Sequence, residues 1–341
     1  MATGTSCSEV LRTIMAGGSL DRAETHAVFG QIMDGQWSEP QTAALLIALA
    51  DKGETVEEIA GAAQAMRDHV VPIDTDGADV IDTCGTGGTG LSTFNVSTAG
   101  AIVAAGAGAK VAKHGNVTHT RVSGSANVLR ALGVNLDAPP AVLSRCLAEA
   151  GVCFCYAIKH HPAMKYAAPV RKALGVRTIF NLLGPLTNPA GARRQVMGVF
   201  DAAWTETIAR VLGMLGAERA FVVHADDGLD ELATTSQTTV CEWRDGQVTT
   251  QTVRPEDFGL ARAKIEDLLV DSPDASAAII LEVLAGRKGP ARDIVVLNAA
   301  AALAVAGLAE TIQDALPKAR ESIDSGAANA ALAKLVEVSN A

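Results

Sequence analysis

The chain has 341 residues and a formal net charge of −10 at pH 7, because 28 Lys and Arg stand against 38 Asp and Glu. Nucleic-acid backbones are bound mainly through Lys and Arg, so this charge argues against a nucleic-acid-binding protein. Aromatic residues make up only 4% of the chain, which also argues against a base-stacking platform. The length predicts two domains or one large domain.

The first seventy residues have helical patterns only. Helices are expected near 21–34, 38–51 and 55–70, with Ser19 as the N-cap of the first of them. No strand pattern occurs before Pro72. The N-terminal part of the chain is therefore expected to be an all-helical bundle.

After residue 78 the pattern changes to short apolar strands that alternate with helices. Strands are expected at 78–83, 109–113, 134–136, 152–157, 196–200 and 220–224. This alternation predicts βαβ units and a parallel sheet. Residues 162–184 return to helical character, a polar strand pair is expected near 238–250, and a long alanine-rich helix over 292–309.

The predicted fold class is therefore α/β, with a small all-helical domain and a larger α/β domain around a mostly parallel central sheet. We place the helical domain at 1–73, with 162–192 returning to it. The α/β domain takes 74–161 and 193–341. Because no linker separates the two, we expect them to pack with a cleft between them.

Nothing in the sequence predicts secretion or a membrane span. The N-terminal residues show neither the basic nor the apolar region of a signal peptide. The longest apolar run, 294–309, is interrupted by Asn298 and is shorter than the roughly 18–20 residues that a span needs. The six cysteines are too scattered for a disulfide framework. We expect a cytoplasmic protein.

A glycine-rich loop, Cys84-Gly-Thr-Gly-Gly-Thr-Gly90, follows the strand at 78–83 and precedes a helix. Its spacing matches the dinucleotide-binding pattern, but the next strand ends in Lys113 and His114 instead of an acidic residue for a ribose. The Lys-Ser or Lys-Thr of a Walker A loop is absent. We interpret the loop as a backbone cradle for an anion, since glycines let N–H groups approach it closely.

Further polar residues gather near this loop. The start of the next helix carries Ser92, Thr93, Asn95, Ser97 and Thr98. One helix cap needs only one such residue, which favours phosphate contacts for the set. Lys113-His-Gly-Asn116 ends a strand, and Ser123-Gly-Ser125 opens another helix. Because open α/β sheets bind ligands at the carboxyl ends of their strands, we expect a site there.

An acidic segment, Asp226-Asp-Gly-Leu-Asp-Glu231, follows the strand at 220–224. Four carboxylates so close together repel one another unless a cation lies among them. Mg²⁺ typically takes one or two carboxylates together with substrate phosphates. The segment and the anion cradle therefore predict a ligand that consists of Mg²⁺ and a diphosphate.

These strings together resemble the anthranilate phosphoribosyltransferase family. The matching strings are Cys84–Gly90, Asn95–Thr98, Lys113–Asn116, Ser123–Ser125, His161–Met164, Arg171, Arg177–Pro189 and Asp227–Glu231. They occur in family order over essentially the whole chain, and Arg177–Pro189 is long and distinctive. Three residues depart from the family pattern: Thr89 and Asn127 stand where we expect Asp, and Val117 where we expect Arg.

The resemblance implies an enzyme of tryptophan biosynthesis. Anthranilate would displace pyrophosphate from 5-phosphoribosyl 1-pyrophosphate (PRPP), giving N-(5-phosphoribosyl)anthranilate, with Mg²⁺ as cofactor. It also implies a small helical domain hinged to an α/β domain, and a homodimer through the helical domains. No nucleic acid and no membrane are expected as partners.

The resemblance also implies roles for individual residues. PRPP is expected at Gly85, Gly87, Gly88, Thr89, Thr93, Asn95, Ser97, Thr98, Lys113 and Ser125. Anthranilate is expected at Gly85, His114, Asn116, His161 and Arg171, where Arg171 offers its carboxylate a bidentate partner. Mg²⁺ is expected at Ser97, Asp230 and Glu231. No residue is expected to act as an obligatory general acid or base, because an aryl amine needs positioning more than deprotonation.

Three other interpretations remain open from the sequence. The nearest is a pyrimidine nucleoside phosphorylase of the same fold, which uses phosphate and a nucleoside; Arg177–Pro189 and Asp230-Glu231 favour the transferase. A nucleic-acid-binding relative needs a basic surface, against which the net charge argues. An inactive paralogue is suggested by Thr89 and Val117.

Overall fold

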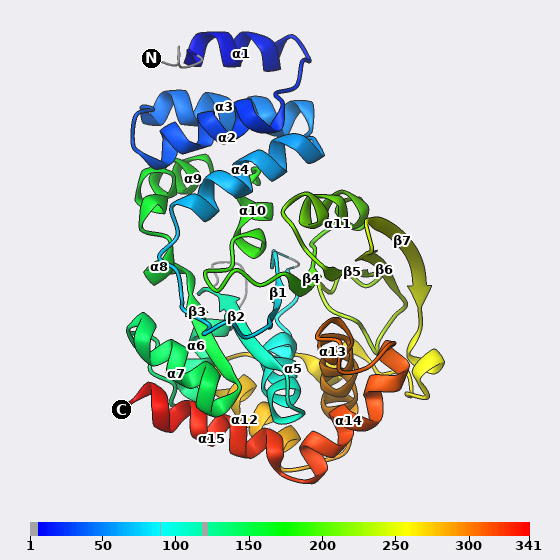
Figure 1. Cartoon of the computed structure of the whole chain (residues 1–341). Helices are drawn as coiled ribbons and strands as arrows, with labels where there is room; N and C mark the ends of the chain where they lie inside the picture. The colour runs from blue at the N-terminus through cyan, green and yellow to red at the C-terminus, as the bar shows by residue number, and fades with distance from the viewer. Residues whose placement is uncertain (1–5, 89, 118–121) are drawn as a thin grey trace.

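The computed structural model describes residues 6–88, 90–117 and 122–341. Four helices form a bundle at one end of the molecule, at the top of Figure 1. They are α1 (Cys7–Met15), α2 (Arg22–Met33), α3 (Glu39–Lys52) and α4 (Val56–Asp68). The last three agree with the predicted helices, whereas α1 was not predicted.

The N-cap of helix α2 lies two residues later than expected. Its N-cap is Asp21, whose carboxylate accepts a hydrogen bond from the backbone N–H of Glu24 at 2.8 Å, and Glu24 completes a capping box. The prediction of Ser19 as N-cap is therefore wrong. The Ser19 hydroxyl instead accepts a hydrogen bond from Lys52 Nζ at 3.2 Å, which ties the loop before α2 to the end of α3.

A seven-stranded sheet in the order β3-β2-β1-β4-β5-β6-β7 forms the centre of the rest of the chain. Its strands are β1 (Val80–Gly85), β2 (Lys110–Gly115), β3 (Val152–Tyr156), β4 (Arg194–Gly198), β5 (Arg219–Ala225), β6 (Thr238–Arg244) and β7 (Gln247–Val253). The first five are parallel, and β6 and β7 add an antiparallel edge. This confirms the predicted α/β class with a mostly parallel sheet.

The expectation of a strand at 134–136 is wrong. These residues lie in the connection between two helices, and Val134 and Leu136 are buried there as loop side chains. Burial alone therefore explains the apolar character that suggested a strand.

Helices cover both faces of the sheet (Figure 1). The longer ones after the bundle are α5 (Val96–Gly106), α6 (Ser125–Ala131), α7 (Pro140–Ala150), α11 (Trp204–Met214), α12 (Pro273–Leu284), α13 (Pro290–Val305), α14 (Ile312–Asp324) and α15 (Ala327–Ser339). The last two were not predicted. Two short turns, η3 (Pro255–Phe258) and η4 (Ile265–Leu268), precede α12. Among the described residues, no helix is both long and apolar enough to cross a membrane.

Two separate apolar cores lie on the two faces of the sheet. Side chains alternate between the faces of a strand, so Phe221 and Val223 of β5 pack into one core and Val222 into the other. The first core also contains the alanine-rich α5 and α13, which pack against each other. The second core is shared by α11 and the helical bundle. The sheet therefore fixes the position of the bundle relative to the strand ends.

Residues 157–186 form a series of short helices that lead back to the bundle. They are α8 (Ala157–His160), η1 (Pro162–Tyr166), α9 (Ala168–Leu174), α10 (Phe180–Leu183) and η2 (Gly184–Leu186). Helix α9 packs against α3 and α10 packs against α4, with the rings of Phe29 and Phe180 centred 5.7 Å apart. The proposed division into domains at 1–73, 162–192, 74–161 and 193–341 stays a prediction.

Candidate functional site

The predicted polar segments follow the carboxyl ends of strands β1, β2 and β5. The glycine loop follows β1, Lys113–Asn116 ends β2, and the acidic loop follows β5. In the sheet, β4 separates β1 from β5. The acidic loop must therefore cross the end of β4 to reach the glycine loop.

That crossing depends on two residues without side chains. A Cβ atom on Gly198, at the end of β4, would lie 1.7 Å from the carbonyl oxygen of Asp230. A Cβ atom on Gly85 would lie 2.5 Å from Asp230 Oδ2. Glycine is thus required at both positions by the close approach of the acidic loop. The need for Gly198 was missed from the sequence, because a single glycine after a strand has no local pattern.

A direct hydrogen bond joins the two loops. The backbone N–H of Gly87 donates to Asp230 Oδ2 at 3.0 Å, and the N–H of Thr86 donates to the carbonyl oxygen of Gly198 at 2.9 Å. Gly87 and Gly88 have φ angles of +64° and +76°, a conformation that favours glycine. The glycine loop is therefore a tight turn held against the acidic loop. Thr89, the next predicted residue, lies outside the described part of the chain.

The four carboxylates of the acidic segment divide into two pairs. The carboxylate of Asp226 accepts a hydrogen bond from Gln237 Nε2 at 2.7 Å, and that of Asp227 accepts one from the Thr235 hydroxyl. These two stabilise their own loop. Asp230 is 5% exposed and faces the glycine turn, and Glu231 lines a narrow cavity at the strand ends together with Thr83 and Ser97.

This arrangement suits a hard divalent cation. The side chains of Asp230, Glu231 and Ser97 carry oxygen atoms, the ligand type that such a cation prefers. In the described ranges, no three His, Cys, Asp or Glu side chains cluster as a metal cage. The donor set fits an ion such as Mg²⁺, which is held by one or two carboxylates and completes its shell from substrate phosphates and water.

Lys113 is a buried cation at this edge of the sheet. Its side chain is 2% exposed, and Nζ donates to the carbonyl oxygen of Thr83 and to the Ser97 hydroxyl, the latter at 3.2 Å. A buried ammonium requires hydrogen-bond acceptors or a counter-ion. Lys113 thus links β2 to the first turn of α5 and places a positive charge beside the narrow cavity.

The other polar residues at the start of α5 make different contacts. Asn95 Oδ1 accepts from the hydroxyls of Ser123 at 2.6 Å and Ser276 at 2.8 Å, so Asn95 joins α5 to two other segments. Thr93 is 4% exposed and forms a β-bridge with Leu269. The Thr98 hydroxyl is buried and has no hydrogen-bond partner in the described part of the chain.

Two histidines meet on the other side of Lys113. His114 and His161 are 4% and 8% exposed, and their Nε2 atoms are 3.1 Å apart. Burial lowers the pKa of His161 to about 4 and holds that of His114 well below its ordinary range, with His161 adding to the latter shift. Both rings are therefore neutral near pH 7. The backbone N–H of His114 donates to the buried Asp82 carboxylate at 2.9 Å.

Acid is expected to destabilise the protein through this pair. The unfolded chain binds protons to His161 below about pH 6.5, whereas the folded chain resists them until about pH 4. The free energy of unfolding should therefore fall as pH falls through this window, by on the order of 2 kcal/mol between pH 6.5 and 5 for His161 alone. Urea unfolding at several pH values measures it. His161→Asn should flatten this slope; an unchanged slope would contradict the assignment.

The remaining predicted residues lie around this centre. Ser125 begins α6, and its Cβ atom limits the space at Gly115, where an added Cβ would lie 3.0 Å away. Asn116 is exposed and accepts a hydrogen bond from the Val117 N–H at 2.8 Å. Arg171 lies half-buried in α9, over the ring of Phe180, and burial lowers its pKa. No hydrogen bond in the described residues joins Arg171 to the histidine pair.

Sequence reasoning also missed residues that hold the site from a distance. Asn298 of α13 accepts the N–H of Leu232 at 3.0 Å and donates to its carbonyl oxygen at 2.8 Å, which fixes the end of the acidic loop. Arg177 donates to the carbonyl oxygen of Gly88 at 2.7 Å. Asn298 interrupts an apolar run, a signal that could have marked it as a buried polar contact.

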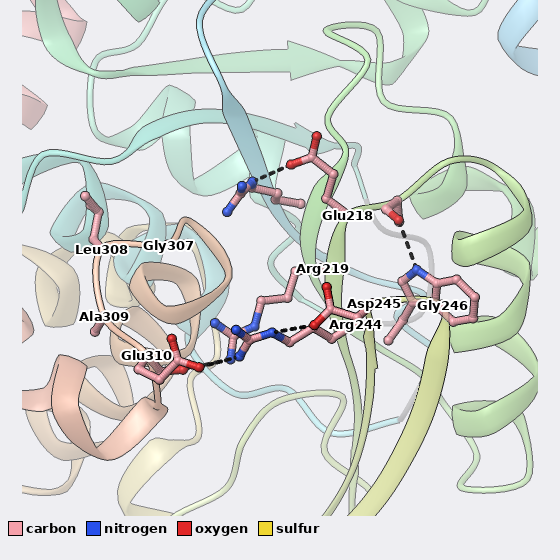
Figure 2. A pocket seen from close by; sticks show the side chains of 12 residues that line it. Glu218, Arg219, Arg244, Asp245, Gly246, Gly307, Leu308, Ala309 and Glu310 are labelled. Atoms are coloured by element: carbon pink, nitrogen blue, oxygen red, sulfur yellow. Dashed lines mark hydrogen bonds and ion pairs between the residues drawn. The ribbon is translucent and has the colours of Figure 1, made fainter.

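A separate cavity lies at the amino ends of β4 and β5, at the opposite ends of these strands from the polar segments. Its volume is about 620 Å³. Figure 2 shows side chains that line it, among them Arg219, Arg244 and residues 307–310. Its arginines are already occupied: Arg219 pairs with Glu242 at 2.7 Å and donates to two carbonyl oxygens beyond, and Arg244 pairs with Glu310 at 2.6 Å. These contacts hold the C-terminal end of α13 against the sheet, so the cavity has a structural explanation.

Two family models match the chain. The model described as the helical bundle domain of a glycosyl transferase family matches residues 8–70. The model of the a/b domain of that glycosyl transferase family matches residues 77–329. Together they account for most of the chain.

Curated relatives are similar over nearly their full length. The anthranilate phosphoribosyltransferase of Anaeromyxobacter sp. (strain K) is 52% identical over 328 residues, which cover 96% of this chain and 97% of the relative. That of Caulobacter vibrioides is 51% identical over 331 residues, which cover 97% of this chain and 96% of the relative.

Solved structures agree with the fold. The anthranilate phosphoribosyltransferase of Thermus thermophilus superposes with a TM-score of 0.92 at 41% identity, over 97% of this chain and 99% of that one. The Saccharomyces cerevisiae anthranilate phosphoribosyltransferase in complex with PRPP and Mg has a TM-score of 0.89 at 27% identity, over 98% of both chains. The yeast protein with 4-fluoroanthranilate has a TM-score of 0.87 at 26% identity, over 98% of this chain and 99% of that one.

Proposed function

This chain belongs to the anthranilate phosphoribosyltransferases, which are glycosyltransferases of tryptophan biosynthesis, and from this membership we infer how its own residues carry the reaction. We propose that it transfers the phosphoribosyl group of PRPP to the amine of anthranilate and releases pyrophosphate. The observation that carries the proposal is the hydrogen bond between the Gly87 N–H and Asp230 Oδ2, because it joins the turn that we propose for the phosphates to the carboxylate that we propose for the metal ion.

The glycine turn and α5 are proposed to hold the phosphates of PRPP. The backbone of Gly85, Gly87 and Gly88 lies at the end of β1, where a narrow turn lets N–H groups approach an anion. Lys113 supplies a full positive charge beside that turn. The remaining proposed PRPP contacts are Thr89, Thr93, Asn95, Ser97, Thr98 and Ser125. Thr93 and Thr98 are buried at the start of α5, as Lys113 is at the end of β2.

Mg²⁺ is the proposed cofactor, with Asp230, Glu231 and Ser97 as the residues that would hold it. The yeast relative is described with PRPP and Mg together. Bound there, the ion would supply Lewis-acid stabilisation of the negative charge that develops on pyrophosphate. Gly85 and Gly198 have no side chains, which leaves the space that Asp230 occupies beside the glycine turn.

The anthranilate amine is proposed to be positioned, not deprotonated. His114 and His161 are neutral near pH 7 and buried, so they shape a low-polarity wall beside the strand end. An aryl amine attacks without losing a proton first, so orientation supplies most of what the protein must add. We propose that no residue acts as an obligatory general acid or base and that the positive groups around pyrophosphate lower the barrier. Asn116 is the further proposed contact for anthranilate.

A homodimer through the helical bundle is also proposed. Met15 of α1 and Ile47 of α3 are 78% and 41% exposed, and these two helices pack against each other. We propose that the surface around these two side chains is the interface. Light scattering should give twice the mass of one chain, and Met15→Glu should shift the measured mass towards that of a single chain. A cytoplasmic location stays an expectation from the sequence.

One assay tests the proposed function. The purified protein should consume anthranilate, measured as loss of its fluorescence, only when PRPP and Mg²⁺ are both present. Pyrophosphate should appear in equal amounts. Turnover of thymidine or uridine with phosphate instead would indicate a nucleoside phosphorylase, and no turnover at saturating PRPP would overturn the enzyme assignment.

Replacing Arg171 with alanine should weaken the binding of anthranilate much more than the binding of PRPP. A guanidinium on α9 is the proposed partner of the anthranilate carboxylate, and losing two charge-assisted hydrogen bonds should raise its KM roughly 100-fold. The KM of PRPP should change less than about threefold. Lys172→Ala is the matched control, since Lys172 is the exposed neighbour on the same helix. Equal losses for both substrates would exclude this role.

A further inference from the structure

We propose that Arg177 is a positioning residue for PRPP, which acts by holding the Gly87–Gly88 turn in the shape that receives the phosphates. The inference rests on the proposed function and adds to it a residue far from the glycine loop in the chain. Arg177 lies between α9 and α10, and 89 residues separate it from Gly88.

Two contacts place the Arg177 side chain. Its Nη2 donates to the carbonyl oxygen of Gly88 at 2.7 Å. Its guanidinium carbon lies 4.3 Å from the centre of the Phe200 ring, which is cation–π distance. Phe200 is half-buried just beyond β4 and packs against the second apolar core. The ring is therefore a firm support for a side chain that is otherwise exposed.

The glycine turn is anchored at two successive residues. The Gly87 N–H is held by the Asp230 carboxylate, and the Gly88 carbonyl oxygen is held by Arg177. Both residues have positive φ angles, and glycines lose the most conformational freedom when they are ordered. Anchoring the turn before the ligand arrives removes part of the ordering cost from binding.

The two anchors also differ in charge. The carboxylate of Asp230 is proposed to bind the metal ion, while Arg177 adds a positive charge at the rim of the turn. A fixed cation there favours the approach of an anionic substrate. The Phe200 ring matters because a planar guanidinium keeps its orientation on an aromatic face, which a lysine ammonium does not.

The test measures steady-state kinetics for four variants: Arg177→Ala, Arg177→Lys, Phe200→Leu and the double variant Arg177→Ala/Phe200→Leu. Arg177→Ala should raise the KM of PRPP about tenfold and leave the KM of anthranilate within twofold. Arg177→Lys should recover part of the loss. Phe200→Leu should raise the KM of PRPP less than Arg177→Ala does. The double variant should have the same KM of PRPP as Arg177→Ala, because Phe200 acts only through the Arg177 side chain that it supports.

Arg193→Ala is the matched control. Arg193 is also exposed and also donates to a glycine carbonyl oxygen, that of Gly216 at 3.0 Å. It should leave both KM values unchanged. An unchanged PRPP KM in Arg177→Ala, equal rises for both substrates, or additive losses in the double variant would overturn the inference. Absence of turnover in the unmodified protein would instead overturn the proposed function.

Discussion

Lys113→Met should lower kcat/KM for PRPP by about 10²- to 10³-fold, the loss found when one preorganised donor to a developing negative charge is removed. Methionine keeps most of the volume of the side chain and removes its charge and its hydrogen bonds to Thr83 and Ser97. Loss of the charge should also leave pyrophosphate a poorer leaving group, so kcat should fall together with PRPP binding. Initial rates over a range of PRPP concentrations measure both.

The same substitution at Lys110 is the control. Lys110 begins the same strand, β2, but lies at its other end, where Nζ donates to the carbonyl oxygens of Leu147 and Ala148, both at 2.9 Å. Lys110→Met should change kcat/KM less than about threefold, because this end of the sheet is remote from the proposed phosphates. If the two variants lost activity equally, a role of Lys113 in binding PRPP would be ruled out.

Gly198→Ala should both destabilise the protein and disable the site. The added methyl group would lie 1.7 Å from the carbonyl oxygen of Asp230, and the backbone of β4 cannot move without disturbing its parallel neighbours β1 and β5. Overpacking of this kind should lower the free energy of unfolding by roughly 3 kcal/mol. The acidic loop should also be displaced from the glycine turn, so turnover should fall below detection. Urea unfolding and initial rates measure the two effects.

Gly100→Ala is the control for this change. Gly100 is buried in α5, but its added Cβ would lie 3.5 Å from the nearest atom, the Ala299 nitrogen, which is an ordinary contact. Alanine is also the better helix former by about 1 kcal/mol. The stability of Gly100→Ala should therefore match or exceed that of the unmodified protein. If Gly198→Ala were as stable and as active as the unmodified protein, the close approach of the acidic loop to Gly198 would be ruled out.

Much of the fold could be predicted because it depends on local patterns. The helices α2 to α4 and the strands β1, β2 and β3 were recognisable from apolar periodicity and from glycine-rich ends. The strand expected at 134–136 was wrong because a short apolar run is buried equally well in a loop. The N-cap of α2 was misplaced because Ser19 and Asp21 both suit the position, and only the Asp21–Glu24 capping box decides between them.

The candidate site was predictable to the extent that its chemistry is carried by contiguous strings. The glycine loop, Lys113–Asn116 and the acidic segment each follow a strand, and parallel strands bring their carboxyl ends to one edge. The residue types of the acidic segment do not by themselves show which of its four carboxylates faces the glycine turn. Hydrogen bonds to Gln237 and Thr235 occupy Asp226 and Asp227, and this division appears only after folding.

Most of the elements, the fold class and the chemical types gathered at the carboxyl ends of the strands could be predicted from the sequence, because each depends on neighbouring residues. The folded chain was needed to show that Gly198 must lack a side chain, that Asn298 fixes the acidic loop and that Arg177 anchors Gly88. These contacts join residues that are tens of positions apart in the chain. Their geometry follows from the strand order and the packing of whole elements, which local periodicity does not encode.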